Sequence, residues 1–139
     1  ADDVWVRSTA MLEEGRRKRA QGQSMMVSRW DIVPIPEHLR SNLSSDSIME
    51  FPVEVAQSMV DFRPVDVVAK IAPRPLLLVH AANDSVTPTA QSIEMMQHAG
   101  AGAELMVLGG IDHFPFANER SRIRDLLRGW FEANFPLVS

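Results

Sequence analysis

The sequence has 139 residues, of which 45% are hydrophobic and 23% charged, and its formal net charge is −4. This length and composition fit one globular domain and exclude a disordered chain. The acidic balance excludes a nucleic-acid partner, and no apolar run reaches the roughly 20 residues of a membrane helix. Because cysteine is absent, disulfides, thiolate nucleophiles and cysteine-based metal sites are excluded. We therefore expect a soluble, cytoplasmic protein.

The first 50 residues predict a helix followed by irregular structure. Residues 5–21 favour a helix by composition, with Gly15 as an interruption, and the four basic residues at 16–19 are typical of a solvated helix face. Residues 25–47 mix apolar residues with two prolines and end in a run of Ser, Asn and Asp, which indicates loops. We place a boundary after residue 50, so that residues 51–139 form a second, more regular segment.

A short helix is predicted over residues 53–62, where Pro64 stops it, and a strand begins after Pro75. Residues 76–82 are apolar on both faces, which is typical of a strand inside a parallel sheet covered by helices. Thr87 is the expected cap of a helix that Pro88 opens. The buried face of this helix is predicted to contain Ile93, Met96 and Ala99, and Gly100 to end it.

A second apolar strand is predicted over residues 103–108, so that strand, helix and strand form a right-handed βαβ unit. The last segment is the clearest amphipathic helix of the chain, with Asn118 as its expected cap and Pro136 at its end. We expect its stripe to cover one face of the sheet, and that stripe consists of Ile123, Leu126, Leu127, Trp130 and Phe131.

Two polar residues follow the two predicted strands. Asp84 lies in the loop after the first strand, and His113 lies in the loop after the second, behind Gly109 and Gly110. The carboxyl ends of parallel strands meet at one sheet edge, where open α/β sheets bind ligands, so these residues are expected to be neighbours. An Asp that accepts from a histidine ring fixes its tautomer and stabilises the imidazolium form. The pattern predicts an acid and base pair that needs a nucleophile.

The remaining candidates favour structural roles. Asp112 is a rival acid, but adjacent side chains in extended backbone point opposite ways, so it should face away from the partner of His113. His80 is predicted to be a hydrogen-bonded core residue, while His98 and His38 are predicted at the surface. No histidines and carboxylates show metal-ligand spacing, and no glycine-rich phosphate loop follows a strand, so we expect no metal and no cofactor.

The segments IAPRPLLLVHAANDSVTP and ELMVLGGIDHFPF resemble the acid loop and the histidine loop of the α/β hydrolases, in particular serine hydrolases similar to dienelactone hydrolase and prolyl oligopeptidase. The resemblance covers residues 62–135 and implies an α/β fold whose C-terminal part carries these loops. It implies that Asp84 is the triad acid and His113 the general base. Residues 1–50 would then be a cap-like segment, and Ala81 stands where that family often has glycine.

The sequence departs from that family in one respect that matters, because it contains no G-x-S-x-G nucleophile motif. The nearest match, around Gly22 and Ser24, lacks the second glycine and follows a basic helical segment. We expect a serine hydrolase of an ester, amide or peptide bond, represented here by its C-terminal segment, with self-association or pairing with the missing N-terminal part. The alternatives are a non-catalytic domain for binding or assembly and one chain of a two-chain hydrolase.

Overall fold

The structure, a computed structural model, describes residues 2–118 and 120–136, and their contacts divide the chain into two units. Unit 1 ends at Arg63 and unit 2 begins at Pro64. The sequence places its boundary between residues 50 and 51. Helix α3 (Val53–Asp61) therefore lies in unit 1 and not with the C-terminal segment.

Unit 1 is built on one long helix that packs against a short one. Its elements are α1 (Asp2–Ala20), β1 (Met26–Ser28), α2 (Arg29–Ile32), the 3₁₀ helix η1 (Glu37–Asn42), β2 (Glu50–Pro52) and α3. Strands β1 and β2 pair antiparallel with Val27 opposite Phe51. This pairing and helix α2 were not predicted from the sequence, which indicates only loops over residues 25–47.

The core of unit 1 lies between α1, α3 and the two short strands. Leu12, Val27, Val53 and Ala56 are its buried residues. Gly15 does not interrupt helix α1. The glycine allows a close contact between α1 and α3, since a Cβ on Gly15 would lie 2.6 Å from Cγ2 of Val53. The basic residues after Gly15 lie on the outside, as predicted. Among them, Arg19 forms a 3.0 Å ion pair with Glu54.

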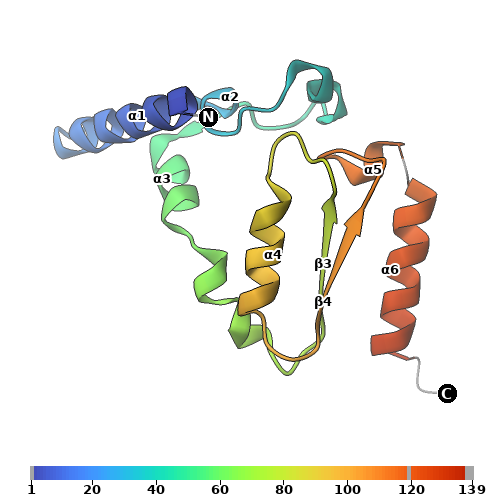
Figure 1. The fold of residues 1–139 in the computed structure, drawn as a ribbon. Helices are drawn as coiled ribbons and strands as arrows, with labels where there is room; N and C mark the ends of the chain where they lie inside the picture. The colour runs from blue at the N-terminus through green and yellow to red at the C-terminus, as the bar shows by residue number, and fades with distance from the viewer. Residues whose placement is uncertain (1, 119, 137–139) are drawn as a thin grey trace. The chain divides into compact units, whose positions relative to one another are not determined.

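Unit 2 contains the predicted βαβ arrangement and its C-terminal helix. Its elements are the 3₁₀ helices η2 (Pro64–Asp66) and η3 (Val68–Ile71), then β3 (Leu76–Ala81), α4 (Thr89–His98), β4 (Ala103–Leu108), α5 (Pro115–Asn118) and α6 (Arg120–Asn134). Strands β3 and β4 pair in parallel, from Leu76 opposite Ala103 to Ala81 opposite Leu108. Figure 1 shows α4 on one side of this strand pair and α6 on the other.

Hydrogen bonds fix which face of the strand pair each helix covers. On one face, the Ser92 hydroxyl of α4 lies 2.6 Å from Nδ1 of His80 in β3. On the opposite face, Nε1 of Trp130 in α6 donates to Oε1 of Glu104 in β4 over 3.0 Å. Because side chains alternate along a strand, both faces of the pair are covered, which explains why β3 is apolar on both faces.

The helices bury the strand pair β3 and β4 less completely than the sequence suggests. Most of β3 is only half-buried, because within the described residues β3 pairs with β4 alone and its other edge has no strand. Ile123 is buried, but Phe131, expected in the same stripe, is 54% exposed, and Ile93 of α4 is also exposed. Two strands offer too little surface to bury every apolar residue of the flanking helices.

Candidate functional site

The loops that follow β3 and β4 leave from the same edge of the strand pair, as the parallel register requires. The loop after β3 carries Asp84, and the loop after β4 carries His113. The second loop is held to α6, since Arg122 donates to the backbone carbonyl of Gly109 over 2.9 Å. The structure thus brings the two candidate residues to one edge, and their predicted proximity is confirmed.

The Asp84 carboxylate is fixed by its own loop. Its Oδ1 accepts the backbone N–H groups of Val86 at 2.8 Å and of Thr87 at 2.7 Å. Only 6% of this side chain is exposed. Thr87 was predicted to cap α4 with its side chain, and this is wrong: α4 begins after Pro88 without a side-chain cap, while the Thr87 amide is bound by Asp84.

The imidazole of His113 faces this carboxylate through one ring nitrogen. Nδ1 lies 3.0 Å from Oδ2 and 3.1 Å from Oδ1 of Asp84. An ionised carboxylate only accepts hydrogen bonds, so Nδ1 carries the proton and Nε2 of the neutral ring is the basic nitrogen. The His113 side chain is 28% exposed, and no described residue forms a hydrogen bond with Nε2. Nε2 is therefore available to accept a proton.

The electrostatics keep the carboxylate ionised. Burial raises the pKa of Asp84, but the backbone N–H groups of Thr87 and Val86, the hydrogen bond from His113 and its charge together hold this pKa below its ordinary value of 3.8. At neutral pH, Asp84 is thus a negative acceptor that stabilises a positive charge on His113.

Asp112 does not take the place of Asp84. Its carboxylate points to Ser85 in the neighbouring loop, and none of its described hydrogen bonds is with the His113 ring. The sequence predicted that Asp112 faces away from the partner of His113; instead, its carboxylate reaches the loop of that partner, at the residue that follows Asp84. The contact with Ser85 itself was missed, because no sequence pattern specifies how two loops meet.

His80 forms the hydrogen bonds of a core residue, as predicted. Its Nε2 lies 3.0 Å from the carbonyl oxygen of Thr87, so Nε2 carries a proton, and Nδ1 accepts from Ser92. Nε2 is also 3.6 Å from Oδ2 of Asp84, a proximity that the sequence did not reveal. His80 therefore supports the loop that carries Asp84. His98 and His38 are exposed, also as predicted.

The remaining candidates from the sequence lie outside the Asp84–His113 pair. Ser24, in the nearest match to a nucleophile motif, is exposed in the loop between α1 and β1 of unit 1. Within residues 2–118 and 120–136, no group of three histidine or carboxylate residues is arranged to hold a metal ion. The expected Asn118 cap concerns a side chain outside the described part of the structure. None of the described helices has the length and apolarity needed to cross a membrane.

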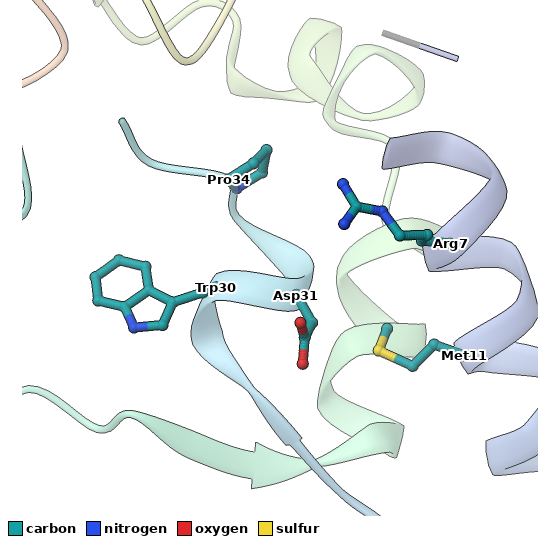
Figure 2. A pocket seen from close by; sticks show the side chains of 5 residues that line it. All are labelled: Arg7, Met11, Trp30, Asp31 and Pro34. Atoms are coloured by element: carbon teal, nitrogen blue, oxygen red, sulfur yellow. The ribbon is translucent and has the colours of Figure 1, made fainter. Parts of the chain in front are cut away.

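Unit 1 contains a cavity of about 230 Å³ between α1 and α2. In Figure 2, Arg7 and Met11 from α1 and Asp31 from α2 border the same space, while the indole of Trp30 points away from α1; Pro34 completes the lining. The guanidinium of Arg40 lies 4.4 Å from the centre of the Trp30 ring. Because the lining combines a cation and a carboxylate with apolar groups and has neither a histidine nor a serine, it offers binding contacts and not an acid and base pair.

Comparison with known proteins supports the fold. No family model and no curated protein matches this sequence. The α/β hydrolase GrgF from Penicillium sp. sh18 is structurally similar, with a TM-score of 0.71 and 18% identity over 94% of this chain and 50% of that chain. The hypothetical protein PA2218 from Pseudomonas aeruginosa is also similar, with a TM-score of 0.62 and 19% identity over 94% of this chain and 45% of that chain. This chain spans about half the length of these structures. Its fold is therefore that of a part of an α/β hydrolase.

Proposed function

We propose that this chain supplies the acid and the base of a serine hydrolase that cleaves an ester, amide or peptide bond. One observation carries the proposal: Nδ1 of His113 lies 3.0 Å from the Asp84 carboxylate, at the carboxyl ends of two parallel strands. Such a pair activates a weak nucleophile, because the ring takes the nucleophile's proton while the carboxylate stabilises the charge that the ring acquires. The fold seen in GrgF and in this chain is consistent with this chemistry.

In the proposed reaction, a serine Oγ attacks the carbonyl carbon of the substrate, and Nε2 of His113 accepts the hydroxyl proton. The tetrahedral intermediate collapses as Nε2–H gives that proton to the leaving alcohol or amine, which leaves an acyl ester on the serine. Water then attacks the acyl carbon while Nε2 accepts its proton, the bond between the acyl carbon and the serine Oγ breaks, and Nε2–H returns the proton to Oγ as the carboxylic acid product leaves. Asp84 stays ionised throughout, in agreement with its lowered pKa.

The serine is proposed to come from outside this chain. No G-x-S-x-G motif occurs in the 139 residues, and Ser24 belongs to unit 1, in a loop after a helix and not after a strand. The second edge of β3, which has no partner strand among the described residues, is where a further parallel strand would pair. We propose that a segment of a longer or assembled protein pairs there and supplies the nucleophile, and that residues 1–50 act as a cap.

A fluorophosphonate probe tests the proposal, since it labels an activated serine. We expect no labelling of the 139-residue chain alone, and labelling together with hydrolysis of p-nitrophenyl acetate when the complete reading frame that encodes it is expressed. The variants His113→Ala and Asp84→Asn should each slow labelling by about 10³-fold or more. His98→Ala is the matched control, because His98 is an exposed histidine of α4 and should leave labelling unchanged.

Two results would contradict the proposal. Labelling of the complete protein at the same rate with and without His113 would remove this residue from the mechanism. The second result is a complete protein that folds, contains no G-x-S-x-G motif and is never labelled. This result would favour a non-catalytic domain for binding or assembly, the alternative that the absence of the motif from this chain also suggests.

A further inference from the structure

Asp112 joins the two loops that carry Asp84 and His113. Its Oδ1 accepts the backbone N–H of Ser85 at 2.8 Å and the backbone N–H of His113 at 2.7 Å. One oxygen atom thus connects the residue that follows Asp84 to His113 itself. Apart from the contacts of Asp112 with Ser85 and the Asp84–His113 pair, no hydrogen bond between described residues joins these two loops.

The Ser85 side chain reinforces this connection. Its hydroxyl lies 3.0 Å from Oδ1 and 2.9 Å from Oδ2 of Asp112 and donates to this carboxylate, which as an ion can only accept. Hydrogen bonds to a charged acceptor are stronger than those between neutral groups. Among the described residues, the carboxylate binds three donors from two loops, an arrangement that a neutral side chain of the same size cannot fully reproduce.

We infer that Asp112 is a positioning residue that sets the distance and angle between the His113 ring and Asp84. This inference rests on the proposed function, since it concerns the same acid and base pair. The described contacts of the Asp112 carboxylate are with Ser85 and with the backbone N–H of His113, and none of them is with the His113 ring. Asp112 acts through the backbone of Ser85 and His113, whose positions decide whether Nδ1–H points at the Asp84 carboxylate. Among the described hydrogen bonds, the remaining anchors of the loop after β4 are the Asp84–His113 pair itself and the bond from Arg122 to Gly109, four residues before His113.

The experiment determines the tautomer of the His113 ring in the full 139-residue chain, without substrate. Nitrogen chemical shifts from ¹⁵N-labelled protein distinguish Nδ1–H from Nε2–H at pH 8.5, well above the usual histidine pKa of about 6.5. In the wild type, we expect the Nδ1–H tautomer. In Asp112→Ala, the ratio of Nδ1–H to Nε2–H should fall about tenfold, because hydrogen bonds to charged groups change equilibria by this order.

Three further variants separate positioning from folding. Asp112→Asn keeps one acceptor oxygen and should fall between the wild type and Asp112→Ala. Ser85→Ala keeps the amide donor and removes the hydroxyl, so its effect should be smaller still. Asp125→Ala is the matched control, because the Asp125 side chain is 65% exposed on α6 and forms an ion pair with Arg128 on the same helix. It should show the wild-type tautomer.

The outcomes distinguish this inference from the proposed function. A wild-type tautomer ratio in Asp112→Ala would overturn the positioning role, even if the complete protein reacts with the fluorophosphonate. If Asp112→Ala does not fold, an unchanged ratio in both Asp112→Asn and Ser85→Ala overturns it equally. A graded loss of the Nδ1–H tautomer across the three variants supports the positioning role even if no labelling of the complete protein is found.

Discussion

Nδ1 of His113 faces both carboxylate oxygens of Asp84, at 3.0 and 3.1 Å, although the two residues come from separate loops. The same carboxylate binds the backbone amides of Val86 and Thr87. Asp84 thus orders its own loop and also orients the ring in the next one. Its ionisation should therefore affect the stability of unit 2 as well as its chemistry.

The pKa of Asp84 predicts how stability depends on pH. This pKa is lowered in the folded chain from 3.8, so the ionised group stabilises the fold above pH 3.8, and this contribution is lost as pH falls through the folded pKa. Asp84→Asn should reduce the free energy of unfolding by about 1–2 kcal/mol at pH 7, since hydrogen bonds to a charge are lost. Below pH 3.8 the difference from the wild type should shrink.

Urea unfolding at pH 7, 5, 4 and 3 measures this difference. Asp125→Asn, at an exposed position of α6, controls for the change in net charge and should stay within about 0.5 kcal/mol of the wild type at each pH. A difference between Asp84→Asn and the wild type that stays constant down to pH 3 would show that ionisation of Asp84 does not contribute.

The two glycines before His113 should respond differently to substitution. Gly110 has a φ of 77°, in the left-handed region, whereas Gly109 does not have a positive φ, and a Cβ on either would meet no atom within 4 Å. Gly110→Ala should therefore cost about 1–2 kcal/mol through backbone strain alone, and Gly109→Ala should stay within about 0.5 kcal/mol. Thermal unfolding measures both, and equal stability of the two variants would contradict the assigned loop conformation.

Two helical glycines give a second matched pair. A Cβ on Gly15 would lie 2.6 and 2.7 Å from the methyl carbons of Val53, a stiff and buried side chain, while a Cβ on Gly129 of α6 would meet nothing within 4 Å. Alanine gains up to about 1 kcal/mol over glycine in a helix, but overpacking costs about 1–3 kcal/mol. Gly15→Ala should thus destabilise unit 1 and Gly129→Ala should stabilise unit 2.

Chemical denaturation of both variants checks these signs. The double variant Gly15→Ala with Val53→Ala should be more stable than the two single changes predict by addition, because the smaller side chain at 53 accommodates the new methyl group. Additive effects would mean that α1 and α3 do not approach each other at Gly15.

The proximity of Asp84 and His113 could be predicted from the sequence because it depends on topology alone. Two apolar strands with one helix between them must run parallel, and their following loops then share an edge. The role of Gly15 could not be predicted, because the reason for a glycine there is Val53, which lies far along the chain. Helix propensity alone indicates an interruption at this position.

The sequence also did not predict very short elements or contacts that form only in the folded chain. Strands β1 and β2 have three residues each, too few for an alternating pattern to be recognised. Threonine is a residue type that often caps helices, but in the folded loop the backbone N–H of Thr87 donates to the Asp84 carboxylate. The contact of Asp112 with Ser85 likewise exists only once both loops are in place. The sequence pattern thus predicts where the loops lie, and not which donors meet inside them.

The unpaired edge of β3 leads to the last prediction. The backbone N–H groups of Leu76 and Ala82 bond to the carbonyls of Gly102 and Leu108 on the β4 side. Since N–H directions alternate along a strand, those of Leu78 and His80 also point to β4, and those of Leu77 and Val79 point to the edge without a strand. Such an edge pairs readily with another strand. We therefore expect the 139-residue chain to self-associate at micromolar concentration.

Light scattering over a dilution series should give masses above the 15.5 kDa of one chain, and hydrogen exchange should identify the edge used. The amides of Leu78 and His80 should be protected at every concentration, while those of Leu77 and Val79 become protected only as concentration rises. Val79→Pro removes an outward N–H and should reduce association with the fold retained, because proline is tolerated on an edge strand. In contrast, Leu78→Pro removes a bond to β4 and should unfold unit 2. A monomer at all concentrations with Leu77 and Val79 already protected would show that this edge is closed by the chain itself, and would remove the argument for a completing strand.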